Sequence, residues 1–260
     1  MNQTRNIIFV TGTDTGVGKT VMTGMLLHYL RQQGCHAMAM KPFCCGDTKD
    51  VDILRELQAG ELSSWEINPY YFPDPVAPIA SRAKKQTNIS VSMVAERIYA
   101  IAQRCELLLV EGCGGLKVPI CKGLLLIDVI AELKCPVILV GKNKLGVLNH
   151  VLLSAESLER RRIRKLTIAL MEEEKLDASA RTNAKILGNL LPSCRVFSLG
   201  FMGENIMDAG VLKEKSSMVQ EIVAHARLHA YVPAAPEGRR SKKKKKPFDS
   251  GKEINKLTAL

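Results

Sequence analysis

The chain has 260 residues, of which 46% are hydrophobic, and a formal net charge of +11. This length and composition fit one full-sized domain, alone or with an appendage. No apolar stretch approaches the roughly 20 residues of a membrane helix, and the start "MNQTRNIIFV" is interrupted too soon for a secretory signal; we therefore expect a soluble protein.

The eight cysteines show no C-x-x-C spacing and no companion histidine cluster. This pattern argues against a zinc site or a disulfide framework, and it favours a cytoplasmic location. The positive charge is uneven, because residues 231–260 carry nine Lys or Arg against three Asp or Glu and so supply +6. We interpret residues 1–230 as the folded domain and residues 231–260 as a basic, disordered tail without a specific nucleic-acid or membrane partner.

The first elements along the chain are a strand, a glycine-rich loop and a helix. The apolar run "NIIFVTG" predicts a strand, and "KTVMTGMLLHYLRQQG" has apolar residues at helical spacing as far as Gly34. Between them, "GTDTGVGKT" (residues 12–20) is almost the phosphate-binding pattern G-x-x-x-x-G-K-[ST], with one additional residue between its glycines. Gly16 and Gly18 let backbone N–H groups approach a polyphosphate at the start of a helix. Lys19 would reach the outer phosphates, and Thr20 would offer a hydroxyl to Mg²⁺.

The rest of the chain alternates short apolar runs with helical stretches. We predict strands at "CHAMAMK", "CELLLVEG", "CPVILVG", "LTIALM" and "CRVFSLG", with helices near 50–59, 90–104, 123–134, 147–161, 179–190 and 216–229. Strands that are apolar on both faces and separated by helices indicate an α/β fold with a doubly wound, mainly parallel sheet flanked by helices, similar to P-loop NTPases. The proline-rich segment "NPYYFPDPVAPIASRAKK" suits neither regular element and is typical of a functional loop.

Charged residues follow several predicted strands, at the sheet edge where α/β proteins bind their ligands. Lys41 ends the second strand, Asp52 follows soon after, and Glu111 ends the apolar run "LLLVE". A carboxylate in that apolar frame needs a partner, and we predict that Thr20, Asp52 and Glu111 bind Mg²⁺. Two alternatives stay open at this point: Lys41 as a solvated strand end, and Asp52 as a charge that complements the helix dipole.

The motifs "GTDTGVGKT", "KP", "DVDIL", "NPYYFPDPVAP", "VEGCGGLKVP", "CPVILVG" and "KLGVLNH" together resemble the dethiobiotin synthetase family over about residues 5–160. The family belongs to a P-loop class that also includes partitioning and division-site ATPases, whose loops carry a lysine where this one has Asp14. The resemblance implies an ATP- and Mg²⁺-dependent reaction in which 7,8-diaminononanoate takes up CO₂ as a carbamate, is phosphorylated, and closes to the cyclic urea dethiobiotin. It also implies a homodimer that receives the far carboxylate of the substrate at the "KLGVLNH" helix start.

The resemblance further implies a role for each matching residue. Lys19, Lys41 and Thr15 would serve catalysis. Nucleotide contacts would come from Thr13, Asp14, Thr15, Gly16, Val17, Gly18, Lys19, Thr20, Val21, Glu111, Gly112, Gly114, Met171 and Glu204. Substrate contacts would come from Lys41, Cys45, Gly114, Leu145, Gly146, Val147 and Asn149.

Three positions depart from the family pattern, and one of them is Ile79, which stands where the family often has a histidine. Cys45 replaces a serine, and a thiol is a poorer hydrogen-bond donor. Met171 replaces an asparagine that reads adenine, and a thioether can only pack against a base; we therefore predict that CTP or GTP is used within roughly tenfold of ATP. These departures leave two other functions open, a partner-stimulated ATPase switch of the partitioning type and a non-catalytic nucleotide-binding homologue.

Overall fold

A computed structural model describes residues 6–82 and 88–225. Its core is a six-stranded sheet in the order β10-β9-β8-β1-β5-β2, in which every neighbouring pair is parallel. The strands are β1 (Ile7–Gly12), β2 (Ala37–Met40), β5 (Leu107–Gly115), β8 (Val137–Lys142), β9 (Leu166–Met171) and β10 (Arg195–Leu199). The predicted doubly wound parallel sheet is confirmed. The predicted tail at residues 231–260 lies outside the described part of the chain.

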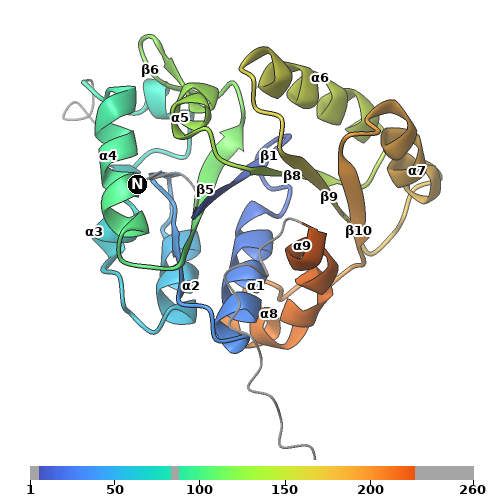
Figure 1. The fold of residues 1–260 in the computed structure, drawn as a ribbon, viewed down its shortest axis with the longest axis horizontal. Helices are drawn as coiled ribbons and strands as arrows, with labels where there is room; N and C mark the ends of the chain where they lie inside the picture. Colours follow the sequence, from blue (N-terminus) through green and yellow to red (C-terminus); the bar gives the residue numbers. More distant parts are fainter. Residues whose placement is uncertain (1–5, 83–87, 226–260) are drawn as a thin grey trace, which may run out of the picture.

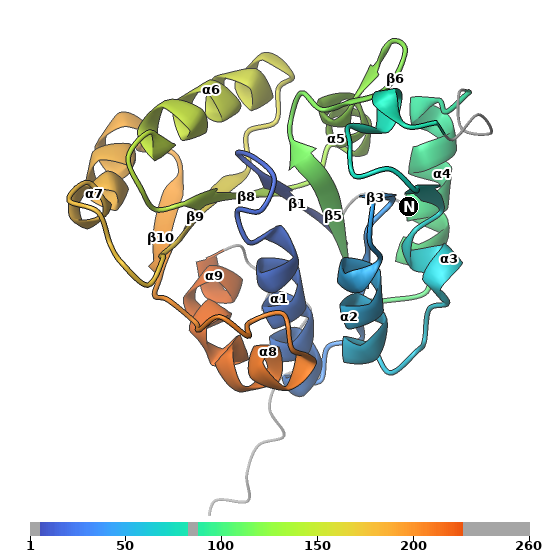
Figure 2. The same ribbon diagram turned by 180° about the vertical axis from the view of Figure 1, so that it is seen from behind.

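Helices cover both faces of the sheet (Figures 1 and 2). On one face, α1 packs against β1, β2 and β5 and is covered in turn by α2 and α8. On the other face, α4 and α5 pack on β5, and α6 packs on β8. The helices are α1 (Lys19–Gln32), α2 (Lys49–Leu57), α3 (Ser64–Ile67), α4 (Val91–Ala102), α5 (Leu126–Leu133), α6 (Val147–Arg160), α7 (Ala180–Leu190), α8 (Ala209–Lys215) and α9 (Gln220–His225).

The central strands are buried along nearly their whole length, because both faces of the sheet are covered. All six residues of β1 are buried, and the first six residues of β5 are buried as well. Such strands need hydrophobic residues on both faces, which explains the continuous apolar runs in the sequence.

Three regions differ in detail from the sequence prediction. The helix predicted at 123–134 begins only at Leu126, because the preceding residues form a small hairpin of β6 (Pro119–Cys121) and β7 (Leu124–Leu125). Of the helix predicted at 216–229, residues Ser216–Val219 form a 3₁₀ turn and Gln220–His225 form α9, while residues 226–229 lie outside the described part of the chain. A short parallel pair, β3 (Phe43–Cys45) and β4 (Tyr70–Phe72), was not predicted. In the described residues, no helix has the length and apolar character needed to span a membrane.

The sheet register brings the sequence motifs together. β1 lies between β5 and β8, and Val10 of β1 is paired with Glu111 of β5. β2 is the other neighbour of β5, so Lys41, which follows β2, emerges at the same edge. The glycine-rich loop, Lys41 and Glu111 therefore meet at the carboxyl edge of three adjacent strands, the usual ligand-binding edge of an open α/β sheet.

Candidate active site

The loop between β1 and α1 has the backbone geometry of a phosphate-binding loop. Gly16 and Gly18 have positive φ angles of 69° and 98°, which favour glycine, and the N-terminus of α1 has no side-chain cap. The Lys19 ammonium donates to the Asp14 carbonyl oxygen at 2.8 Å and so folds across the loop. A free helix N-terminus beside an ammonium group is suited to bind a polyphosphate.

Gly12 shows why the first glycine stands one residue earlier than in the common pattern. A Cβ atom on Gly12 would lie 2.7 Å from Cγ2 of Val17 and 2.8 Å from the Asp14 carbonyl oxygen. Both distances are too short for non-bonded contacts. The longer loop folds back over Gly12, and only glycine fits beneath it.

The Glu111 carboxylate lies beneath the loop and is fully buried. Its Oε1 accepts hydrogen bonds from the Thr20 hydroxyl and from the Lys41 ammonium, each at 2.7 Å. Its Oε2 is also buried, and within residues 6–82 and 88–225 it has no hydrogen-bond partner. An orphaned carboxylate oxygen is costly in a protein interior, and a bound cation would satisfy it.

Lys41 is held between two carboxylates. It is only 6% exposed and forms ion pairs with Glu111 and with Asp50. Burial alone lowers the pKa of the Lys41 ammonium, but the nearby Glu111 and Asp50 charges outweigh it and raise the pKa above its usual value. Lys41 is therefore charged at any physiological pH. Asn68 fixes the backbone here by donating to the Lys41 carbonyl oxygen at 2.9 Å.

Lys19 differs from Lys41 in its partners. Burial lowers the pKa of Lys19, and the Glu111 carboxylate offsets this only in part. Its hydrogen-bond acceptor is the neutral Asp14 carbonyl, and no carboxylate of the described residues is in direct contact with its charge. Lys19 is thus the ammonium group more readily available to an anionic ligand.

A cavity of about 730 Å³ opens above these groups, and we call it the P-loop cavity. It brings together the predicted residues Thr15, Gly16, Gly18, Lys19, Thr20, Val21, Lys41, Cys45 and Gly114. The proline-rich loop predicted to be functional supplies part of its wall through Pro75, Val76, Ala77 and Pro78. The sequence prediction missed Asp47, Asp50 and Cys113, which also line the cavity.

The structure places Asp50, and not Asp52, at the cavity. Asp52 was predicted to bind Mg²⁺, but it is exposed, and its carboxylate accepts from the Thr48 hydroxyl at 3.1 Å. Residues two apart on a helix point in opposite directions, and Asp50 shares the inward face of α2 with the buried Leu54 and Leu57. The i, i+4, i+7 spacing of these three residues was a signal in the sequence that could have identified Asp50.

A second, smaller cavity of about 280 Å³ adjoins the P-loop cavity and shares Gly16, Gly18, Val21 and Ile206 with it. We call it the side cavity. Met171 lies in its wall, and a Cβ atom on Gly18 would be 3.2 Å from Cγ of Met171. Val17 also lines it, as predicted for a nucleotide contact. Three of the other predicted nucleotide contacts line neither cavity, because Glu204 is exposed, Gly112 faces the core and Glu111 is fully buried.

Gly112 has a packing role. A Cβ atom there would lie 2.8 Å from Cδ2 of Leu126 and 3.0 Å from Cε1 of Phe9. Gly114, by contrast, lines the P-loop cavity with a φ of 55°, and its missing Cβ would meet Val118 at 2.7 Å. The glycine turn after Glu111 thus lets β5 pack tightly on α5 and keeps the cavity open.

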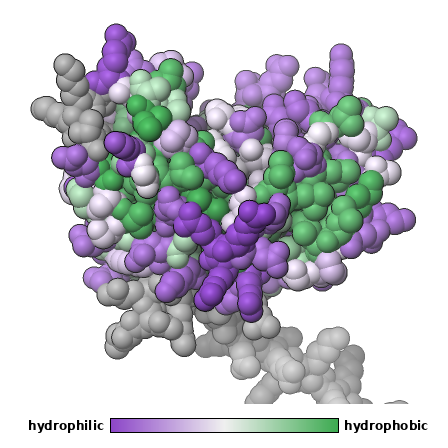
Figure 3. Space-filling model, turned by 90° about the horizontal axis from the view of Figure 1, so that it is seen from above, coloured by the Kyte–Doolittle hydropathy of each residue, from purple (hydrophilic) through white to green (hydrophobic). Residues whose placement is uncertain are grey.

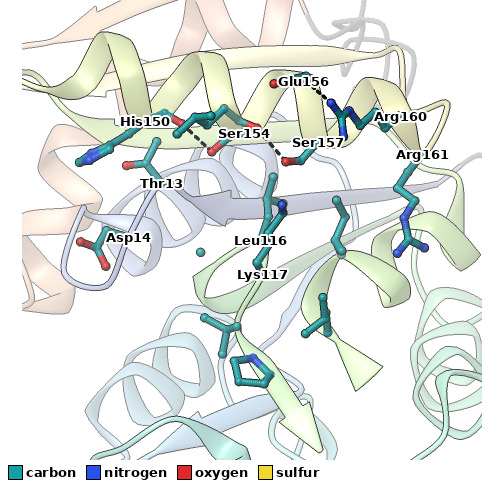
Figure 4. Close-up of a pocket in the computed structure, with 16 residues that line it drawn as sticks. Thr13, Asp14, Leu116, Lys117, His150, Ser154, Glu156, Ser157, Arg160 and Arg161 are labelled. Carbon is teal, nitrogen blue, oxygen red and sulfur yellow. Dashed lines mark hydrogen bonds and ion pairs between the residues drawn. The ribbon is translucent and has the colours of Figure 1, made fainter. Parts of the chain in front are cut away.

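A groove of about 770 Å³ separates α6 from the loop that follows β5, and we call it the α6 groove. Figure 4 shows His150, Ser154 and Ser157 on the α6 side and Thr13, Leu116 and Lys117 on the opposite side. Thr13 and Asp14, which were predicted to bind nucleotide, line this groove and not the P-loop cavity.

The predicted substrate contacts at the start of α6 do not reach the P-loop cavity of the same chain. Leu145, Gly146, Val147 and Asn149 are all absent from its walls. The N–H of Leu145, expected to be free for an anion, donates to the Asp177 carboxylate at 2.6 Å, and the N–H of Val147 donates to the Lys144 carbonyl oxygen at 3.1 Å. An acidic side chain of the chain itself therefore already occupies this helix start.

Metal binding at the P-loop cavity would depend on few protein ligands. No group of three or more His, Cys, Asp or Glu side chains suited to a metal ion occurs among the described residues. Mg²⁺ bound with a nucleotide commonly takes one or two carboxylates and fills its remaining positions with phosphate oxygens and water. The unpartnered Glu111 oxygen, the Thr20 hydroxyl and Asp50 fit that requirement.

Comparisons with known proteins identify the family. The AAA domain family model matches residues 6–194. The ATP-dependent dethiobiotin synthetase of Akkermansia muciniphila is 34% identical over 221 residues, which cover 81% of this chain and 99% of the relative. The chain belongs to the dethiobiotin synthetase family. The ATP-dependent dethiobiotin synthetase of Anaeromyxobacter dehalogenans (strain 2CP-C) is 40% identical over 158 residues, 59% of this chain and 71% of the relative.

Solved structures support the fold assignment. The MinD cell division protein of Aquifex aeolicus superposes with a TM-score of 0.57 at 15% identity, covering 89% of this chain and 99% of that one. A ParA family ATPase from Chlorobium tepidum gives a TM-score of 0.52 at 13% identity, covering 88% and 97%. These likenesses show a shared P-loop fold. The family predicted from the sequence motifs is confirmed by the dethiobiotin synthetase relatives.

The three thiols of the P-loop cavity should react slowly with alkylating reagents. Burial raises the pKa of Cys44 to about 11 and of Cys113 to about 12, and it also raises the pKa of Cys45. Because the thiolate is the reactive form, a raised pKa leaves these groups protonated at neutral pH, and their reactivity should increase as the pH rises above about 9. We expect iodoacetamide labelling at pH 7.5 at roughly a tenth, or less, of the rate of a free cysteine.

Mass spectrometry of labelled peptides measures each site separately. The urea-unfolded chain is the control, because all eight cysteines should then react at ordinary rates. Rapid labelling of Cys113 in the folded protein at pH 7.5 would contradict the prediction.

Proposed function

We propose that this protein catalyses the ATP-dependent carboxylation and ring closure of 7,8-diaminononanoate to dethiobiotin. The observation that carries the proposal is the convergence of the two ammonium groups of Lys19 and Lys41 on one cavity next to a phosphate-binding loop, in a chain of the dethiobiotin synthetase family. The diamine takes up CO₂ as a carbamate, the carbamate oxygen attacks the γ-phosphate of ATP, and the second amine then closes the ring and releases inorganic phosphate.

The protein needs no nucleophile of its own for this reaction, because the substrate carbamate is the attacking group. Its contribution is to position the two substrates and to neutralise charge that develops on the transferred phosphoryl group. Lys19 and Lys41 both supply positive charge to the cavity, and Thr15 offers a hydroxyl beside Gly114. The pairing of Lys41 with two carboxylates keeps its side chain in a fixed position before substrate arrives.

Thr20, Glu111 and Asp50 are the residues that would hold Mg²⁺. The ion would screen the charge of the phosphate oxygens. The two ammonium groups of Lys19 and Lys41 stand against three carboxylates, those of Glu111, Asp50 and Asp47, so the side chains alone give the cavity no excess positive charge. Binding of the triphosphate therefore depends on the loop N–H groups and on a divalent cation.

We infer that the protein acts as a cytoplasmic homodimer in which a second copy covers α6. Leu145, just before α6, is 82% exposed, and Leu153, on α6, is 55% exposed. Figure 3 shows hydrophobic surface beside hydrophilic side chains on the upper face of the molecule. The predicted substrate residues 145–149 lie next to the α6 groove, whose opposite wall carries Thr13 and Asp14 of the P-loop. A partner seated there would complete a site that the single chain leaves open.

Phosphate release from ATP tests the reaction and separates it from the alternatives. We expect release to require both 7,8-diaminononanoate and bicarbonate, with dethiobiotin detected by mass spectrometry. Lys41→Ala should lower kcat by roughly a hundred- to a thousandfold, because a charge directed at the developing phosphoryl charge is lost. Lys49→Ala is the matched control, since Lys49 is 80% exposed and its loss should leave turnover unchanged.

The thermal melting of both variants is recorded alongside, because removing Lys41 leaves the buried Glu111 charge unpaired. Near-normal turnover by a folded Lys41→Ala protein would remove Lys41 from the mechanism. ATP hydrolysis that ignores the diamine would support a partner-stimulated switch, and nucleotide binding without any hydrolysis would support a non-catalytic homologue.

Two neighbouring aspartates test the metal site. Asp50→Asn should raise the Mg²⁺ concentration needed for half-maximal turnover by roughly tenfold, because one of two carboxylates near the ion is lost. Asp52→Asn should leave it unchanged, because Asp52 points away from the cavity. Calorimetric titration of ADP with and without Mg²⁺ gives the same comparison independently of turnover. If Asp52→Asn were the variant that weakened Mg²⁺ use, the assignment of Asp50 would fail.

Two equally exposed leucines test the dimer. Leu153 on α6 and Leu190 on α7 are each 55% exposed. We expect Leu153→Asp to produce a monomer with much reduced turnover, because a charge placed in a hydrophobic interface is costly, and Leu190→Asp to stay dimeric and active. Sedimentation velocity measures the two states. A wild-type protein that is monomeric and fully active would exclude a shared active site.

A further inference from the structure

The side cavity has the position and the walls of a pocket for a nucleotide base. It shares Gly16, Gly18 and Val21 with the P-loop cavity, so the nucleoside part of a nucleotide whose phosphates lie on the loop can extend into it. Its walls include the apolar side chains of Val17, Met171, Phe201, Met202 and Ile206. Apolar walls can pack against the flat face of any base, and they do not distinguish one base from another.

The polar groups of the side cavity come from the residues that follow Met171. Glu172 and Glu173 both line it, together with Lys142. The Glu173 carboxylate forms an ion pair with the Lys142 ammonium at 3.0 Å. Glu172 differs, because its carboxylate makes no ion pair and no hydrogen bond with any residue in the described ranges. It lies along the Gly200 backbone, with Oε2 3.9 Å from the position of a Cβ atom on Gly200.

A carboxylate in a base pocket accepts hydrogen bonds and cannot donate them. Guanine presents two adjacent donors, its N1–H and its 2-amino group, which can bond the two oxygens of one carboxylate. Adenine and cytosine each present one amino group beside an unprotonated ring nitrogen, which the carboxylate repels. Hypoxanthine has the N1–H of guanine without the 2-amino group.

We propose that Glu172 is the residue that selects the nucleotide base, and that it favours guanine. The inference rests on the proposal that this protein uses a nucleoside triphosphate. It adds a side chain that can form hydrogen bonds with the edge of the base, which the Met171 thioether cannot do. GTP should then serve at least as well as ATP, and a base that lacks the 2-amino group should bind more weakly than guanine. Bidentate recognition of a base edge commonly gives roughly ten- to a hundredfold discrimination.

Calorimetric binding of GDP and IDP tests the proposal, because these two nucleotides differ only in the 2-amino group. The titration uses the whole protein with Mg²⁺ and without diamine. We expect GDP to bind at least about tenfold more tightly than IDP. Glu172→Ala should reduce that ratio to nearly one, mainly by weakening GDP. Glu173→Ala, whose carboxylate is already paired with Lys142, should preserve the ratio.

Equal affinity of the wild-type protein for GDP and IDP would overturn the proposal, as would a ratio that survives Glu172→Ala. Binding is measured without the diamine, so this test is independent of turnover. A protein that selects guanine but makes no dethiobiotin would support the role of Glu172 and contradict the proposed reaction. Absence of any nucleotide binding would overturn both. A loss of the ratio in Glu173→Ala alone would move base reading to that residue and contradict the assignment.

Discussion

The active-site edge of this fold depends on one buried carboxylate. Glu111 ends the apolar part of β5 with no exposed surface, and a single oxygen, Oε1, accepts from both Thr20 and Lys41. A buried charge is strongly destabilising when its partner is removed. The ion pair that makes Glu111 tolerable in the core also holds the end of β2 against β5, and the Thr20 hydrogen bond to the same oxygen holds the start of α1 there. The Lys41–Glu111 ion pair therefore both stabilises this edge of the sheet and fixes the position of Lys41.

This constraint also separates the roles of the two lysines. Lys41 is fixed by Glu111 and Asp50, so it contributes a charge of fixed position. Lys19 is held only by a neutral carbonyl oxygen and can exchange that contact for a phosphate oxygen at little electrostatic cost. A site built from one fixed and one exchangeable ammonium suits phosphoryl transfer, in which charge must be neutralised at the attacking group and at the transferred group together.

Local patterns in the sequence were enough to predict the parts of the site that follow directly from strands. The P-loop, Lys41 and Glu111 all stand at the end of a buried apolar run, and the parallel sheet brings such ends together. The sequence prediction assigned Asp52 of α2 to Mg²⁺ because it did not consider which face of the helix turns inward. In the structure, Asp50 lies on the inward face with Leu54. The occupied start of α6 could not be predicted, because its partner, Asp177, is 32 residues away in an irregular segment.

The two ends of the nucleotide site are built from different materials, and this has consequences for how they can vary. The phosphate end uses backbone N–H groups, tightly packed glycines such as Gly12, and a buried ionic cluster, and substitutions of these packed or buried residues disturb the core. The proposed base end uses partly exposed side chains after β9 and in residues 200–206, and the latter lie beyond the part that the family model matches. A change of the Met171 or Glu172 side chain would alter contacts with a base while leaving the backbone pairing at the end of β9 in place. Base preference can therefore change within this family while phosphate binding and fold stay the same.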